Sequence, residues 1–245
     1  MVVIVIKYYR LTASLILKQN INYQQVSRKI GNSIQKNMFN QEKLKKLHNT
    51  KTYKYIFSPL VPFVKKTEYL SGEKYKIYIQ SFDENTIVKF NYSLNNYEDS
   101  NIKVLNLKLQ EIDLSNWIIT EIETLTPAIV TVDNKPWVAN KNSIDELMQK
   151  LFDNLEKKYK MFFEPFWPIK DDINKHLLFE KITILSNKPI SRKYKDINLI
   201  GYKIKINVGS NDIAQKLAKV AIVQGLGEKN TIIGSGYVKY KKLRM

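Results

Sequence analysis

The chain has 245 residues, 44% of them apolar, and its 40 lysines and arginines exceed its 23 aspartates and glutamates to give a formal net charge of +17. This composition excludes a largely disordered chain, and the charge favours a polyanionic partner, either nucleic acid or an anionic membrane surface. With no cysteine and only two histidines, His48 and His176, disulfides, cysteine zinc sites and thiol nucleophiles are excluded, and a histidine metal centre is disfavoured. We therefore expect no metal and no cofactor.

No apolar segment reaches the roughly 18 residues that a membrane-spanning helix requires. The apolar run at the N-terminus is broken by Lys7 and is too short for the core of a signal peptide. We therefore expect a soluble protein of the cytoplasm that has no membrane partner.

The first half of the sequence alternates between strand and helix patterns. Apolar residues at every second position or in short runs predict strands, which cover residues 9–17, 53–61, 75–81 and 101–112. Val26, Ile30 and Ile34 recur every four residues and predict one face of a helix that begins near Asn22. A short basic helix is predicted over 41–47, and residues 83–97 have no clear period.

The second half of the sequence shows the same alternation. Strands are predicted over residues 122–132, 178–185, 200–208 and 236–242. One helix begins at Ser143, which forms a capping box with Glu146 three residues later. A second helix is predicted over 211–224, with Ser210 as its N-cap and Gly225 as a left-handed C-cap.

The order strand, helix, strand, strand, helix, strand in the second half is that of the ferredoxin-like fold. The first half fits the same order if residues 83–97 form a helix. We therefore predict an α+β protein with two tandem ferredoxin-like domains, each βαββαβ, over residues 1–116 and 117–245. A single larger α+β domain is the alternative.

The stretch GLGEKNTIIGSGY, which begins at residue 225, holds Gly225, Gly227, Gly234 and Gly236 around Lys229. Glycine permits close approach of another backbone, and successive amide groups beside a lysine can bind a phosphate. The stretch follows a predicted helix and precedes a predicted strand, whereas a Walker A loop or a dinucleotide fingerprint follows a strand and opens a helix. We predict a phosphate-binding role that suits a nucleic-acid backbone, and a helix cap followed by a tight turn is the structural alternative.

Basic residues also cluster in and after the segment NKPISRKYKD, which lies between two predicted strands. A basic hairpin with an aromatic residue can contact an RNA stem or stack on an unpaired base, and an ordinary solvated hairpin is the alternative. The predicted nucleic-acid contacts from this region and from the polar face of the following strand are Lys188, Arg192, Lys193, Lys203 and Lys205.

The stretch GLGEKNTIIGSGYVKY resembles the C-terminal glycine-rich motif of the CRISPR repeat-processing endoribonucleases, the Cas-six family of the RAMP superfamily. This chain has one additional residue between Lys229 and Gly234. TLTPAIVT at 124–131 resembles the family's strand that opens the second domain, and LHNTKTYKYIFSPL at 47–60 resembles its histidine-bearing segment. The resemblance implies tandem ferredoxin-like domains and a nuclease of CRISPR antiviral defence.

The resemblance also implies a reaction that needs no metal. The ribose 2′-hydroxyl attacks the adjacent phosphorus and leaves a 2′,3′-cyclic phosphate and a 5′-hydroxyl. His48 matches the catalytic histidine of the family, and Lys54 is its partner, with Lys51 as a close rival. Many members carry a tyrosine on the first helix. The matching position here is Gly31, so Tyr23, about two turns away on the same helix, is the candidate replacement.

Three functions therefore remain open at this stage. The chain either cleaves CRISPR repeat RNA, binds it with weak or no cleavage because the helix tyrosine is missing, or serves as a structural RAMP subunit of a CRISPR effector complex. The expected partners are repeat RNA and such a complex, and the protein is expected to be a monomer or a homodimer.

Overall fold

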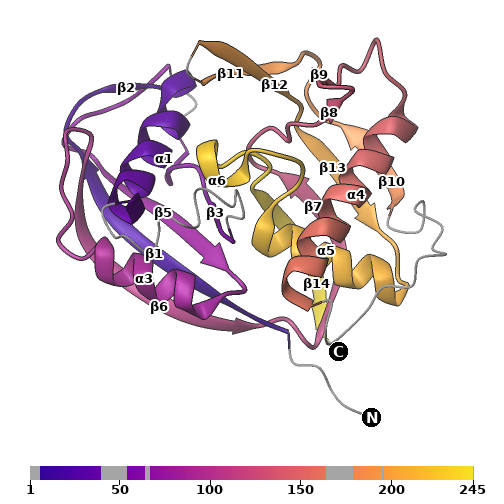
Figure 1. Ribbon diagram of the computed structural model, residues 1–245, viewed down its shortest axis with the longest axis horizontal. Helices are drawn as coiled ribbons and strands as arrows, with labels where there is room; N and C mark the ends of the chain where they lie inside the picture. Colours follow the sequence, from indigo (N-terminus) through magenta and orange to yellow (C-terminus); the bar gives the residue numbers. More distant parts are fainter. Residues whose placement is uncertain (1–5, 40–53, 64–66, 164–178, 195, 245) are drawn as a thin grey trace.

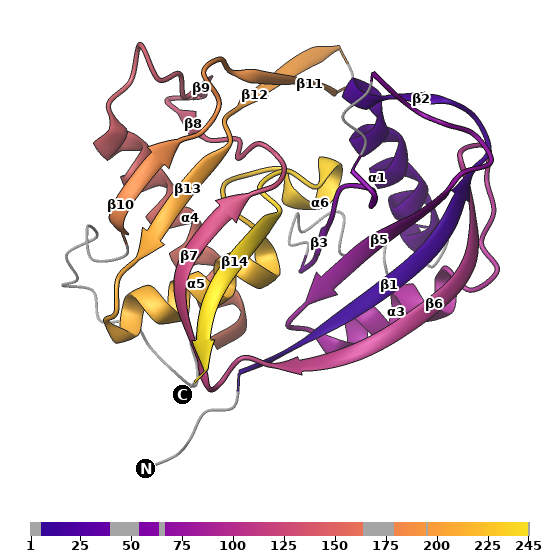
Figure 2. The same ribbon diagram turned by 180° about the vertical axis from the view of Figure 1, so that it is seen from behind.

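The computed structural model describes residues 6–39, 54–63, 67–163, 179–194 and 196–244 (Figure 1). The chain folds into two halves that lie side by side, and each half contains one four-stranded antiparallel sheet (Figures 1 and 2). The first sheet ends with β6 and the second begins with β7, and the turn between these strands joins the halves. The domain boundary at residue 116 stays a prediction.

The first half follows the predicted order of elements. Its sheet has the strand order β3-β5-β1-β6, in which every neighbouring pair is antiparallel. A small extra sheet pairs β2 (Ile21–Asn22) with β4 (Glu68–Tyr69). The main elements are β1 (Lys7–Leu17), α1 (Tyr23–Phe39), β3 (Ile56–Phe57), β5 (Lys74–Ser81), α3 (Glu84–Ser93) and β6 (Ile102–Asp113).

The second half has the same arrangement with two added hairpins and a short helix. Its main elements are β7 (Trp117–Thr124), α4 (Ile144–Phe163), β10 (Phe179–Ile184), β13 (Ile204–Val208), α5 (Asp212–Gln224) and β14 (Val238–Arg244). The sheet order is β10-β13-β7-β14. The additions are β8 (Thr131–Val132) with β9 (Lys135–Pro136), β11 (Ile190–Tyr194) with β12 (Ile197–Gly201), and α6 (Asn230–Ile233).

Both sheets place the first and third strands of the half in the centre and the second and fourth strands at the edges. This is the strand order of a ferredoxin-like βαββαβ unit. The helix α3 supplies the element that the weak pattern over residues 83–97 left open. The prediction of tandem ferredoxin-like folds is therefore confirmed.

Local sequence signals account for the helices. Val26, Ile30 and Ile34 are all buried, as their spacing on α1 predicts. At the start of α4, the Glu146 amide donates to Ser143 Oγ at 3.1 Å, and the Ser143 amide donates to Glu146 Oε2 at 2.9 Å. These reciprocal bonds confirm the capping box.

Two details at the ends of α5 were predicted wrongly. The N-cap is Asn211, whose side chain accepts a hydrogen bond from the amide of Ala214 at 2.9 Å. Gly225 has positive φ, but its ψ of 169° is extended rather than left-handed helical. The chain therefore leaves α5 abruptly and turns directly into the glycine-rich stretch.

Three predicted strands are shorter than their apolar patterns. The strand predicted over 122–132 runs over Trp117–Thr124 instead. It ends early because Pro127 has no amide hydrogen to donate and because Ala128 pairs with Tyr202, outside the main sheet. That same bridge separates β12 from β13, so residues 200–208 do not form one strand. The segment 53–61 keeps only β3 before Pro59, with an isolated bridge at Val61.

Two apolar clusters form the cores of the halves, and hydrogen bonds connect the halves where α5 faces β5 and the residue Lys54 that precedes β3. The side-chain amide of Gln80 donates to the carbonyl of Ile222 at 2.5 Å. The side-chain amide of Gln224 donates to the carbonyl of Lys54 at 3.1 Å. The end of α5, where the glycine-rich stretch begins, is thus fixed against the first half.

Candidate nucleic-acid-binding site

The glycine loop, defined as residues 225–237, connects α5 to β14 and contains α6. The helix α6 packs on α1 and β3, so the loop lies at the junction of the two halves (Figure 1). Residues 228–229 and 231–232 are the part of the loop that solvent reaches. The loop thus presents a short polar edge rather than an open run of bare backbone.

All four glycines of the loop are buried and have positive φ. A Cβ on any of them would collide with the protein's own atoms, so close approach within the protein requires glycine at each position. The atoms met belong to Ile56 for Gly225, Ile129 for Gly227, Phe57 for Gly234 and Leu226 for Gly236. The glycines therefore shape the loop, and their contact with phosphate stays a prediction.

Lys229 is exposed and forms the N-cap of α6 with φ 60° and ψ 23°. This left-handed conformation costs a residue with a Cβ roughly 1–2 kcal/mol. Such strain is most common at functional sites, and it holds the lysine at the edge of the loop. The position of Lys229 agrees with the predicted contact to a polyanion, which stays a prediction.

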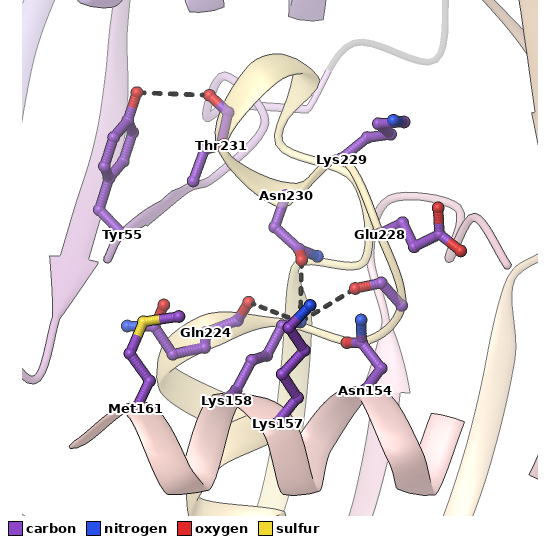
Figure 3. A pocket seen from close by; sticks show the side chains of 11 residues that line it. Tyr55, Asn154, Lys157, Lys158, Met161, Gln224, Glu228, Lys229, Asn230 and Thr231 are labelled. Atoms are coloured by element: carbon purple, nitrogen blue, oxygen red, sulfur yellow. Dashed lines mark hydrogen bonds between the residues drawn. The ribbon is translucent and has the colours of Figure 1, made fainter. Parts of the chain in front are cut away.

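A second lysine, Lys158, which sequence reasoning missed, binds the loop from the side of α4. The ammonium of Lys158 on α4 donates to the carbonyls of Gly225 at 2.8 Å and Gly227 at 2.9 Å and to Asn230 Oδ1 at 2.8 Å (Figure 3). The carbonyl of Gln224 lies at 3.3 Å. Burial lowers the pKa of Lys158 to about 7, while the carboxylate of Glu228 acts to raise it.

A pocket of about 190 Å³ opens between α4 and the glycine loop (Figure 3). Tyr55 and Thr231 line the side of this pocket opposite α4, where the hydroxyl of Tyr55 donates to the carbonyl of Thr231 at 3.4 Å. Lys157 and Lys229 also line the pocket. Within the part of the chain that the structure describes, neither of them forms an ion pair. An anion is the kind of group that this lining favours.

The structure brings together three predicted residues that the sequence separates widely. The guanidinium of Arg192 lies 4.3 Å from the ring centroid of Tyr23, and the ammonium of Lys203 lies 5.5 Å from that of Phe63. The rings of Tyr23 and Phe63 meet edge to face at 5.7 Å. The β11–β12 hairpin is thereby attached to the start of α1. Arg192 is buried, so its charge faces Tyr23 more than solvent.

The other predicted basic residues are spread over the molecule. Lys193 is exposed on β11, and Lys188 is exposed just before that strand begins, as expected for residues that meet RNA. Lys205 lies on β13 and forms an ion pair with Glu121 at 2.7 Å. Lys54 lies at the junction of the halves, with its ammonium 5.8 Å from the ring centroid of Phe162. The RNA contacts of Lys188, Lys193 and Lys205 and the catalytic role of Lys54 stay predictions.

The proposed catalytic histidine and one of its lysines cannot be placed. His48, Lys51 and His176 lie outside the described residues. Gly31, which matches the family's tyrosine, packs against α6 so closely that a Cβ would collide with the carbonyl oxygen of Ile232. No side chain fits at Gly31 unless α6 moves.

Within the described ranges, no group of three histidine, aspartate or glutamate side chains is arranged to hold a metal ion. Among the helices in those same ranges, none is long and apolar enough to cross a membrane.

Neither a protein-family model nor a curated protein matches the chain. Solved structures do match over almost its whole length. A CRISPR-associated protein Cas6 is 22% identical, with a TM-score of 0.69, and the match covers 96% of this chain and 99% of that one. A RAMP protein described as binding different RNA substrates is 16% identical, with a TM-score of 0.68 and coverage of 95% and 99%. A product complex of Thermus thermophilus Cas6 is 13% identical, with a TM-score of 0.67 and coverage of 96% and 100%.

The fold of this chain is thus that of the RAMP proteins, with two ferredoxin-like units in tandem. Within that class, the similar structures named above include Cas6 proteins. Because identity reaches only 22%, this likeness establishes the fold.

Proposed function

We propose that this protein is a CRISPR repeat-processing endoribonuclease that cleaves repeat RNA within precursor transcripts and needs no metal. The observation that carries the proposal is the Cas6 fold, which matches over 96% of this chain. The glycine-rich loop at the junction of the two halves adds to it. The charge of +17 and the lysines around that loop support a polyanionic substrate. Association with a CRISPR effector complex is part of the same proposal.

The proposed reaction is an internal transesterification of RNA. The ribose 2′-oxygen attacks the adjacent phosphorus, the bond from phosphorus to the 5′-oxygen breaks, and the products carry a 2′,3′-cyclic phosphate and a 5′-hydroxyl. The step needs a group to take the 2′-proton, a group to protonate the leaving oxygen and positive charge beside the phosphorane. His48 suits the proton transfers because its ordinary pKa is near neutrality, and Lys54 or Lys51 supplies the charge.

The deciding experiment incubates a CRISPR repeat RNA from the source genome with the protein in EDTA. We expect the wild type to cut once within the repeat and to leave a cyclic phosphate, while His48→Ala binds the repeat without cutting it. His176→Ala is the matched control and should cut normally. Lys54→Ala and Lys51→Ala decide which lysine assists. If wild type and His48→Ala cut equally well, the assignment of His48 is wrong.

One observation favours a second candidate, a protein that binds repeat RNA with weak or no cleavage. The position that matches the family's tyrosine is Gly31, and the carbonyl of Ile232 fills the space beside it. The nearest tyrosine on α1, Tyr23, already packs against Arg192 and Phe63. Tight binding of the repeat by both wild type and His48→Ala, with no product from either, would favour this candidate.

A further inference from the structure

The α4 groove, defined by Lys150, Asn154, Lys157, Gly227, Glu228 and Lys229, runs between α4 and the glycine loop. It consists of the pocket of about 190 Å³ described above and an adjoining pocket of about 270 Å³. The two pockets share Asn154, Lys157, Gly227 and Glu228. Each is smaller than the roughly 300–1,000 Å³ typical of sites for drug-sized molecules, so each suits a small group such as one phosphate.

The charges along the α4 groove differ in how far they are already neutralised. The ammonium of Lys158 is occupied by the oxygen atoms of the loop. The carboxylate of Glu228 accepts from the hydroxyl of Thr131 at 2.6 Å and from its amide at 3.1 Å, which turns it toward that residue. Lys157 and Lys229 are exposed on opposite walls, and Figure 3 shows Lys157 rising from α4 toward the loop. Their positive charge therefore remains available to a ligand.

Asn154 adds a separate indication of a missing partner. Its Oδ1 is buried but accepts no hydrogen bond from the residues that the structure describes. Buried polar atoms are almost always paired, so the unpaired Oδ1 of a residue that lines a groove suggests a ligand or water nearby. The side-chain nitrogen of Asn154 points toward the glycine loop (Figure 3), and its N–H donors suit a phosphate oxygen.

We propose that the α4 groove binds the phosphodiester backbone of an RNA strand, with Lys157 and Lys229 each contacting a phosphate from its own wall and Asn154 beside them. This inference depends on the proposed function only in taking RNA as the polyanion. It assigns α4, on the side of the loop away from α1, a direct part in holding the strand.

The shape of the groove favours a polymer over a free phosphate. Lys150 and Lys157 are seven residues apart on α4, so they lie about two turns apart on the same face of the helix. Lys150 lines the adjoining pocket, which places a second cation further along the groove. Asp153 also lines that pocket and accepts from Gln149 at 2.7 Å, so the second position carries less net positive charge than the first.

The test measures binding of a single-stranded oligouridine RNA between about 50 and 200 mM salt. Lys157→Gln should lower the slope of log K against log salt by about 0.7, the value for one phosphate contact on a single strand. Lys229→Gly should lower the salt slope by a similar amount. Because glycine accepts positive φ without strain, this variant should melt no lower than wild type. Lys89→Gln on α3 removes an exposed lysine far from the groove and is the matched control.

The result that overturns the proposal is a salt slope for Lys157→Gln and Lys229→Gly that equals those of wild type and Lys89→Gln. A parallel measurement adds inorganic phosphate or uridine monophosphate. Lysine-dependent binding of either one, with the RNA slope unchanged, would assign the groove to a free phosphate and would also overturn the proposal. Cleavage of repeat RNA is scored separately, so a wild type that fails to cut but shows the slope change removes the proposed function and leaves this site intact.

Discussion

Gly31 on α1 and the carbonyl oxygen of Ile232 on α6 are in such close contact that a Cβ at position 31 would overlap that oxygen. Phe57 adds a second constraint, since its ring atom Cζ would lie 3.1 Å from the same Cβ. The helix α1 and the glycine loop therefore fit together only because one residue has no side chain.

Gly31→Ala should lower the stability of the protein, although glycine to alanine inside a helix normally stabilises by about 1 kcal/mol. We expect a loss of about 1–3 kcal/mol in the free energy of unfolding, because the methyl group forces α6 away. Asn32→Ala, at the exposed neighbouring position of α1, is the control and should be neutral or slightly stabilising. Urea titrations followed by circular dichroism give both values, and a stabilised Gly31→Ala would contradict the contact.

Lys158→Met should destabilise the protein by about 2–4 kcal/mol near neutral pH, because it leaves several oxygen acceptors under the glycine loop without a donor. Lys157→Met changes the adjacent, exposed lysine and should change the free energy of unfolding by less than about 0.5 kcal/mol. Equal stability of the two variants would show that Lys158 does not hold the loop.

The stability contributed by Lys158 should depend on pH in a defined direction. Burial lowers its pKa to about 7 in the folded protein, against roughly 10.4 for an unfolded lysine. Between these values the unfolded chain binds more protons, so the free energy of unfolding should rise with pH by up to about 1.4 kcal/mol per unit. The measurement is the difference between wild type and Lys158→Met from pH 7 to 10, since other titrations cancel. A difference that stays constant or falls with pH would refute the lowered pKa.

Arg192 and Tyr23 should be energetically coupled, because the guanidinium lies over the ring at 4.3 Å. A double-mutant cycle with Tyr23→Leu and Arg192→Met should give a coupling energy of about 0.5–2 kcal/mol. Lys193→Met, on the exposed neighbour of Arg192, should give a coupling near zero with Tyr23→Leu. If both cycles give the same value, the hairpin is not attached to α1 through this pair.

Much of the fold could be predicted because its signals are local. The alternation along β1, the capping box at Ser143 and the spacing of Val26, Ile30 and Ile34 each depend on residues a few positions apart. The errors in the strands came from distant partners. Ala128 pairs with Tyr202, and that pairing ends one expected strand and divides another.

The candidate site was less predictable because its contacts also join residues that are far apart in the sequence. The glycine motif drew attention to the correct loop, but its glycines contact the protein's own atoms, which no spacing reveals. Lys157 and Lys158 are neighbours in the sequence, and only the position of the glycine loop distinguishes the exposed cation from the buried one. Asn154 lines the pocket although no sequence pattern had singled it out.

The close fit between Gly31 and Ile232 also bears on how the protein is made. The two residues are 201 positions apart (232 − 31), so at roughly 5–20 residues per second a ribosome needs about 10–40 s to pass from one to the other. During that interval the nascent first half presents the surface of α1 and the edge of β3 uncovered. We expect it to depend on chaperones or on rapid translation until α6 emerges, and synonymous codon changes between the two positions should alter the soluble yield without changing a single amino acid.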